Sequence, residues 1–226
     1  MTGVRRRALV DLEALEENLR GELAADPQFR FDARADAYGH LLAVVLPVAR
    51  AVGVDRVRVT SETDADLART IGFPDLLVGR ADDPIDARGY GVDDGRPVLA
   101  VSGEVVAVKR VAAGEGVSYG YSWRAEVDST LALVALGYAD GIPRPASNLA
   151  PVLLAGETRR IVGRIAMDQF VVDCADAQPE PGDRAVLFGD PARGEPALTQ
   201  WARVTGRHPL LLTAALGPRI VREVAS

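Results

Sequence analysis

Apolar residues in the first third of the chain recur with two different periods. Some segments alternate apolar and polar residues, as half-buried strands do, and others repeat apolar residues every three or four positions, as amphipathic helices do. The strand-like segments are 29–34, 55–61 and 74–80, and the helical ones are 41–53 and 62–72. Segment 7–25 begins as a short strand and continues as a helix with Leu15, Leu19 and Leu23 on one face. Ser61 or Thr63 is placed to cap the third helix, and Gly72 to end it. The alternation of strand and helix predicts a parallel α/β unit.

The pattern changes at the segment DDPIDARGYGVDDGRP (82–97), which is rich in turn-forming residues. From Val98 onward, short apolar strands are separated by Gly, Pro, Asp and Asn, and one helix is expected at 196–206 with Trp201 packed inward. The sequence therefore predicts two domains, an α/β domain at 1–95 and a β-rich domain at 96–226.

Composition excludes several classes of protein. The chain has 226 residues, 48% of them hydrophobic, and a net charge of -6, without the basic stripe of a nucleic-acid-binding protein. It shows no apolar run of membrane-spanning length and no signal-peptide pattern, so a cytoplasmic soluble protein is expected. Two isolated histidines and the single Cys174 lack the spacing of metal ligands, so no metal is expected. Cys174 itself is expected to be buried and inert.

The strand at 29–34 has one polar and one apolar face. Arg30, Asp32 and Arg34 share the polar face by period two, and Phe29, Phe31 and Ala33 form the other. We expect the apolar face to pack against helices. The polar face then lines a cleft, solvent or a partner chain, or it consists of solvated arginine–aspartate pairs.

Several longer motifs carry a family resemblance. They are VVAVKRVAAGEGVSYGYSW, LALVALGYADGIPR, VGRIAMDQFVVD, GDRAVLFG and LGPRIVRE. Together they resemble the C-terminal domain of alanine racemases, and VDLEALEENLR and ARADAYGH resemble the start of that family's (β/α)₈ barrel. After about Arg80 the resemblance jumps to the last barrel strand. The expected fold is therefore α/β plus β: a truncated TIM-like barrel followed by an alanine-racemase-like C-terminal β domain.

The resemblance also bears on the cofactor. Where the family has a lysine that holds pyridoxal phosphate (PLP) as a Schiff base, this chain has Arg34, whose guanidinium cannot form that bond at ordinary pH. The family's phosphate-binding turns fall in the missing segment, and Leu210 stands where the family usually has a phosphate-binding tyrosine. On these grounds we predict that no cofactor is bound and PLP is lost.

Other site residues of the family are present. Tyr119 matches the tyrosine that acts as the second acid–base group across a dimer interface, and Arg34 is a candidate cationic neighbour for it. A second group matches residues that contact the cofactor phosphate, the substrate-entry corridor or the partner's active site. This candidate substrate-binding group is Tyr38, Tyr138, Arg144, Arg164, Met167 and Asp168. For each residue a purely structural role is the alternative.

Two hypotheses for the function follow. The first is a PLP-independent acid–base catalyst, of isomerase, epimerase or cyclase type, that uses Tyr119 and Arg34 on a small substrate. The second is a catalytically inactive remnant that binds a ligand or a protein. A third interpretation, an ordinary PLP-dependent alanine racemase, conflicts with Arg34. We favour the first because the Tyr119 segment is retained. Since half a barrel leaves apolar surface uncovered, a homodimer with composite clefts is expected.

Overall fold

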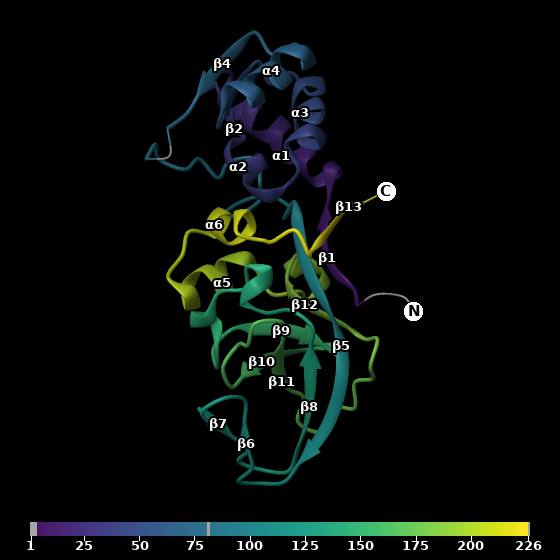
Figure 1. Cartoon of the computed structure of the whole chain (residues 1–226). Coiled ribbons are helices and arrows are strands. Elements are labelled where there is room, and N and C mark those ends of the chain that lie inside the picture. Colours follow the sequence, from purple (N-terminus) through teal and green to yellow (C-terminus); the bar gives the residue numbers. More distant parts are fainter. Residues whose placement is uncertain (1–3, 81, 226) are drawn as a thin grey trace. The chain divides into compact units, whose positions relative to one another are not determined.

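The chain divides into two units in the computed structural model, which describes residues 4–80 and 82–225 (Figure 1). One unit comprises Leu9–Leu99 and Val224–Ser226, and the other comprises Met1–Ala8 and Ala100–Glu223. We call them the α/β unit and the β unit. No helix in the described part of the chain is both long and apolar enough to span a membrane.

The α/β unit is built on a three-stranded parallel sheet. Its strands are β2 (Arg30–Asp32), β3 (Arg56–Val59) and β4 (Asp75–Val78), in the order β2-β3-β4. The helices of this unit are α1 (Leu12–Ala25), α2 (Arg34–Gly39), α3 (Leu42–Ala51) and α4 (Glu62–Ile71). The predicted parallel unit is thus confirmed. Its core contains apolar residues from both the helices and the strands, among them Leu15, Leu19, Phe31 and Val57.

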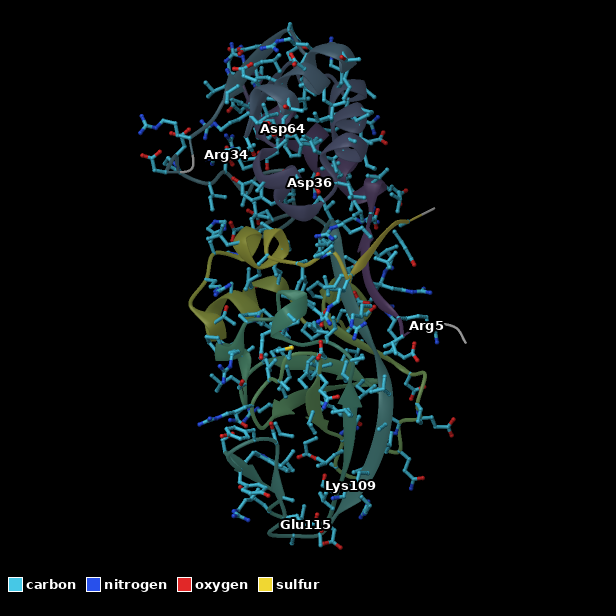
Figure 2. The ribbon with its side chains drawn as sticks, in the orientation of Figure 1. Arg5, Arg34, Asp36, Asp64, Lys109 and Glu115 are labelled. Carbon is cyan, nitrogen blue, oxygen red and sulfur yellow. The ribbon has the colours of Figure 1, made fainter. Side chains whose placement is uncertain are left out.

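The ends of α4 follow the sequence prediction. The Ser61 hydroxyl accepts a hydrogen bond from the Asp64 amide, and the Asp64 carboxylate accepts one from the Ser61 amide, which completes a capping box (Figure 2 labels Asp64). Gly72 ends the helix in the left-handed conformation.

The segment after β2 departs from a simple strand-to-helix connection. Residues 35–38 all have φ between 51° and 56°, so α2 contains a left-handed turn of four non-glycine residues. Side chains hold this turn in place. The Ala35 amide donates to the Thr60 hydroxyl at 2.7 Å, and the Asp36 carboxylate accepts from the Leu42 amide at 2.7 Å.

The β unit contains a closed antiparallel barrel. Strand β5 pairs with β8 along one part of its length and with β12 along another, and this double pairing closes the ring. Its six strands are β5 (Leu99–Val111), β8 (Ser129–Val134), β9 (Pro151–Leu154), β10 (Glu157–Val162), β11 (Phe170–Asp173) and β12 (Arg184–Phe188). Strands β1 (Arg6–Val10) and β13 (Val221–Val224) extend the sheet beyond β5.

Short elements decorate the barrel (Figure 1). They are the hairpin β6 (Gly116–Val117) and β7 (Trp123–Arg124), the 3-10 turns η1 (Tyr138–Asp140), η2 (Arg144–Ala146) and η3 (Pro191–Arg193), and the helices α5 (Leu198–Thr205) and α6 (Pro209–Ala214). The predicted helix around Trp201 is confirmed as α5. The Trp201 ring is buried, and its Nε1 donates to the Pro151 carbonyl at 3.0 Å.

Candidate functional site

A hollow of about 390 Å³ opens on the surface of the β unit. We call it the Tyr119 hollow. Its polar lining residues are Ser118, Tyr119, Tyr138, Arg144, Arg164 and Gln169, and its apolar ones are Leu133, Ile165, Ala166, Met167, Phe170 and Val171. Five of the eight residues proposed from the sequence therefore lie around one cavity.

Tyr138 is placed by a close approach of two loops. The amides of Tyr138 and Ala139 donate to the carbonyls of Ala166 and Met167, each at 3.0 Å. A Cβ atom on Gly137 would lie 2.3 Å from the Met167 carbonyl oxygen, so only glycine allows these loops to meet. The turn at Tyr138 and the Met167 loop therefore form one wall of the hollow.

The buried carboxylate of Asp140 stabilises this wall on the side away from the hollow. Asp140 is fully buried, and its Oδ2 accepts from the Gly137 amide at 2.8 Å. Arg219 lies 2.9 Å from Asp140 Oδ1 and also donates to Asp168 at 2.6 Å. Arg6 approaches the same Asp140 oxygen at 3.6 Å. Asp168 thus supports the Met167 loop through Arg219 and is absent from the lining of the hollow.

Tyr119 sits on the tight turn between β6 and β7. Ser118 has a φ of 63°, and its hydroxyl donates to the Arg164 carbonyl at 2.7 Å, which fixes the turn against the barrel. The Tyr119 side chain is 84% exposed, and its hydroxyl forms no hydrogen bond with the described residues. The phenol is therefore free to meet a ligand in the hollow.

The charge around the hollow is positive. The Arg144 guanidinium lies over the Tyr138 ring, 5.7 Å from its centre. Neither Arg144 nor Arg164 forms an ion pair within the described residues, and none of the described lining residues carries a carboxylate. Two uncompensated arginines beside a phenol favour an anionic ligand, such as a small carboxylate.

Arg34 and Tyr38 lie in the α/β unit, around a buried carboxylate. Arg34 Nε and Nη2 donate to the two oxygens of Asp32 at 2.8 and 2.7 Å. Its remaining N–H groups donate to backbone carbonyls of residues 80, 83 and 84, at distances of 2.6 to 3.2 Å. All five donors of Arg34 are thus used within the unit, and a contact with a ligand would require one of these bonds to break.

The ionisation of this cluster follows from its contacts. Burial alone would raise the pKa of Asp32, but hydrogen bonds from Arg34, the Asp86 amide and the Tyr38 hydroxyl outweigh it and lower that pKa. The pKa of Tyr38 is raised, by burial first and then by the charge of Asp32. Tyr38 donates to Asp32 Oδ2 at 2.9 Å. The polar face predicted for β2 carries arginine–aspartate pairs, which was one of our alternatives. Arg34 is buried against Asp32, and the partly exposed Arg30 pairs with Asp75 at 2.8 Å.

The catalytic pairing of Arg34 with Tyr119 stays a prediction, since the two residues belong to different units. Sequence reasoning assigned no structural role to three residues that the structure shows to be important: Asp32, Ser118 and Arg219. Period two placed Asp32 on the polar face but could not show that it is the acceptor at the centre of the cluster. Arg219 lies in the motif LGPRIVRE, but its contacts with Asp140 and Asp168 are not encoded by any local pattern.

Cys174 is buried, as expected, and burial raises the pKa of its thiol to about 11. Across the described ranges, no three His, Cys, Asp or Glu side chains gather as a metal site would require.

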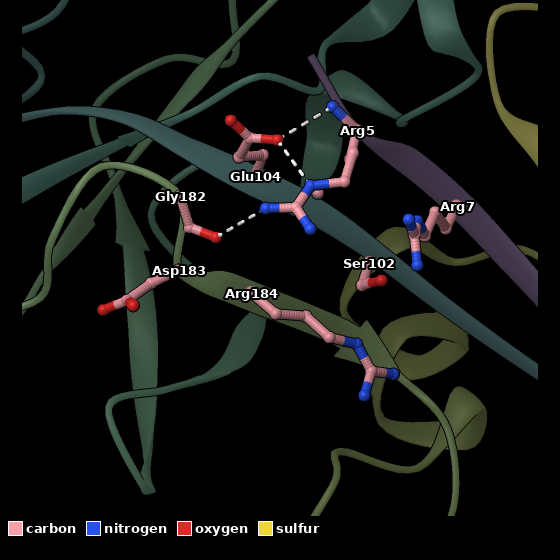
Figure 3. A pocket seen from close by; sticks show the side chains of 8 residues that line it. Arg5, Arg7, Ser102, Glu104, Gly182, Asp183 and Arg184 are labelled. Carbon is pink, nitrogen blue, oxygen red and sulfur yellow. Dashed lines mark hydrogen bonds and ion pairs between the residues drawn. The ribbon is translucent and has the colours of Figure 1, made fainter. Parts of the chain in front are cut away.

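A smaller hollow of about 60 Å³ near β1 is rich in arginine. Figure 3 shows Arg5, Arg7 and Arg184 around Ser102. Each arginine has an acidic partner: Glu104 at 3.0 Å, Glu223 at 3.4 Å and Glu195 at 3.4 Å, respectively. Because its charges are compensated within the unit, this cluster is a structural network.

Comparison with known proteins decides the family. The family model described as "Alanine racemase, C-terminal domain" matches residues 98–224. The chain belongs to this family. The alanine racemase of Salinispora arenicola is 50% identical over 123 residues, which cover 54% of this chain and 32% of that protein. The alanine racemase of Mycolicibacterium vanbaalenii is 39% identical over 209 residues, which cover 88% and 52%. The chain thus spans between a third and about half of these relatives.

Solved alanine racemases share the fold. The enzyme from Streptomyces lavendulae superposes with a TM-score of 0.89 at 24% identity, over 100% of this chain and 98% of that one. The alanine racemase of Bartonella henselae, with covalently bound pyridoxal phosphate, gives 0.79 at 17% identity, over 99% and 100%. The alanine-racemase-like fold predicted from the motifs is confirmed.

These relatives correct the prediction about the cofactor. We predicted that PLP is lost, yet the family includes an alanine racemase solved with covalently bound pyridoxal phosphate, and nothing in this structure shows a loss. The prediction is therefore wrong. The prediction rested mainly on Arg34, and this arginine excludes only the covalent bond to the cofactor. Noncovalent contacts with the ring and the phosphate also bind such a cofactor, and they need no lysine.

The fit of a covalently bound cofactor can be judged at position 34. Arg34 has no amine nitrogen for an imine, and its donors are all engaged. The only lysine of the chain, Lys109, lies on β5 and pairs with Glu115 at 3.4 Å (Figure 2). The residue at position 34 does not fit a covalent attachment of the cofactor.

Proposed function

We propose that this member of the alanine racemase family is an isomerase-type acid–base catalyst that acts on a small amino acid in the Tyr119 hollow. The observation that carries the proposal is the exposed Tyr119 hydroxyl beside two arginines, none of which has a bonded or acidic partner among the described residues. The relatives are named alanine racemases, so alanine is the first substrate to test.

The roles of the residues follow from their chemistry. Arg144 and Arg164 would bind the substrate carboxylate, since guanidinium groups form paired, charge-assisted hydrogen bonds with carboxylates. Tyr119 Oη would then carry a proton to or from the carbon next to that carboxylate. A phenol is a poor base near neutral pH unless a cation lies nearby, and Arg164 lies against the same turn.

Exchange of the α-proton of alanine tests this proposal directly. Wild-type protein is incubated with L-alanine or D-alanine in deuterium oxide, with and without added pyridoxal phosphate, and loss of the α-proton signal is followed by proton NMR. Tyr119→Phe should lose at least about a hundredfold in rate, as expected when a general acid or base is removed.

The matched control is Tyr121→Phe. Tyr121 is a second exposed tyrosine of the same turn, but it does not line the hollow. Its variant should keep the wild-type rate. Full exchange activity in Tyr119→Phe would contradict the assignment.

One observation favours the second hypothesis, a binding protein without catalysis. Arg34, our other catalytic candidate, is fully engaged with Asp32 and backbone carbonyls. If wild-type protein exchanges no α-proton under either condition but binds alanine in a way that Arg164→Gln abolishes, the hollow is a binding site only.

We further propose that the α/β unit is a remnant of the family's barrel and that the working form is a homodimer with composite clefts. Two features support this proposal. The described sheet has open edges at β2 and β4, and Leu77 and Val78 on β4 are exposed. An open, apolar edge strand favours association with another chain.

A further inference from the structure

A second hollow of about 390 Å³ lies on the outside of the barrel, between the β9–β10 hairpin and α5. We call it the Arg160 hollow. Its lining residues are Leu149, Pro151, Thr158, Arg159, Arg160, Gln200, Arg203 and Val204. It shares no residue with the Tyr119 hollow, and nothing in the proposed function uses it.

The arginines of this hollow differ from most others in the chain. Arg160 and Arg203 are exposed and form neither an ion pair nor a side-chain hydrogen bond within the described residues. Arg159 is held differently, by the carbonyls of Leu154 and Cys174 and by Glu157. The arginines in Figure 3 each have a carboxylate partner. By contrast, two of the three arginines of the Arg160 hollow have none among the described residues, and none of its described lining residues is acidic.

The acidic residue opposite Arg160 on the neighbouring strand forms no ion pair with it among the described residues. Asp173 lies opposite Arg160 in the β10–β11 ladder. Its carboxylate instead accepts hydrogen bonds from the Ser129 hydroxyl and the Ala175 amide. In a chain of net charge -6, two uncompensated arginines over one cavity mark a local site for an anion.

The other lining residues can contact the organic part of an anionic ligand. Gln200, Arg203 and Val204 share one face of α5 by helical spacing. Gln200 Oε1 already accepts from the Ala197 amide, which leaves its NH₂ group available to donate. Leu149, Pro151 and Val204 add apolar surface. The Trp201–Pro151 hydrogen bond ties α5 to β9, so the two walls are fixed to each other.

We propose that the Arg160 hollow binds a small organic phosphate. Arg160 and Arg203 hold the phosphate oxygens, because guanidinium groups form bidentate hydrogen bonds with phosphate. Gln200 and Thr158 bond polar groups of the organic part, and its apolar face packs on Leu149 and Val204. A cavity of this volume accommodates a molecule of nucleotide size.

Isothermal titration calorimetry at constant ionic strength tests this site with adenosine monophosphate, inorganic phosphate and adenosine as probes. Adenosine monophosphate should bind the wild-type protein, inorganic phosphate should bind more weakly, and adenosine should give no heat. Arg160→Gln and Arg203→Gln should each raise the Kd for adenosine monophosphate roughly tenfold, the effect of one charge-assisted contact.

The matched control is Arg207→Gln. Arg207 is an exposed arginine just past the end of α5 that does not line the hollow, so its variant should bind like the wild type. Circular dichroism of all variants should match the wild type, since the substituted side chains are exposed. Equal affinity for inorganic phosphate and adenosine monophosphate would show that the phosphate group alone is recognised. The absence of binding up to about 10 mM, or unchanged affinity in the Arg160→Gln/Arg203→Gln double variant, would overturn the proposal.

Discussion

At the scale of single residues, Arg34 links the buried Asp32 carboxylate to three backbone carbonyls of residues 80, 83 and 84. A lysine has one nitrogen with three donors and cannot span this set. We therefore expect Arg34→Lys to lower the free energy of unfolding by about 2 kcal/mol, since buried acceptors lose their partners. Urea denaturation measures the change. Arg80→Lys, at an exposed position, should change stability by less than about 0.5 kcal/mol. Equal stabilities of the two variants would contradict the structural role of Arg34.

The same cluster makes stability depend on pH. The pKa of Asp32 is lowered in the folded state, so its stabilising contribution is present above the ordinary carboxyl pKa of about 4 and is lost as pH falls through the lowered value. We expect the free energy of unfolding to decline in this acidic range, and to decline less steeply in Asp32→Asn. Asp82→Asn removes an exposed carboxylate and should leave the slope as in the wild type. Parallel slopes in Asp32→Asn and the wild type would refute this account.

Residue patterns predicted part of this cluster. Period two placed Arg30 and Asp32 on one face, and the motif containing Arg34 and Tyr38 marked the segment as unusual. The bonds from Arg34 to carbonyls about fifty positions later could not be predicted, because no local pattern encodes them. Only the resemblance to alanine racemases suggested that Tyr119, Tyr138 and Met167 would lie around one cavity.

At the scale of elements, the turn at Tyr138 depends on the absence of a side chain at Gly137. A methyl group there would lie 2.3 Å from the Met167 carbonyl oxygen, so Gly137→Ala should separate the two loops and cost about 3 kcal/mol. Gly21 in α1 has nothing within 4 Å of an added Cβ, so Gly21→Ala should stabilise the protein by about 0.5–1 kcal/mol. Urea unfolding of both variants measures these two changes in the free energy of unfolding, which should have opposite signs. A neutral Gly137→Ala would show that the loops can move apart freely.

Local chemistry explains which elements were predictable. The Ser61 capping box and the inward Trp201 of α5 follow from spacing and capping preferences within a few residues. The left-handed turn at 35–38 does not, because four successive non-glycine residues with positive φ go against local preference. Two side-chain bonds stabilise it: the Thr60 hydroxyl accepts from the Ala35 amide, and the Asp36 carboxylate accepts from the Leu42 amide at the start of α3.

At the scale of the whole molecule, the open edges of the parallel sheet predict self-association. Light scattering after size exclusion, at micromolar protein, should give twice the chain mass of 24.0 kDa. Placing a charge on the exposed β4 edge with Leu77→Lys should shift the protein toward monomer, since edge lysines oppose strand pairing. Ala112→Lys adds a charge at an exposed position on the β unit and should leave the mass unchanged. A monomeric wild-type protein would overturn the proposed dimer.

The closure of the barrel has a consequence for how the chain is made. Strand β12 completes the ring by pairing with β5 through Arg184 and Glu104, and it also pairs with β9. On the ribosome, β5 and β9 are finished long before β12 emerges, so both carry unpaired backbone groups until residue 188 has left the exit tunnel. Contacts between segments so distant in sequence form slowly. We therefore expect the nascent chain to be exposed to aggregation while β9 has emerged from the exit tunnel and β12 has not.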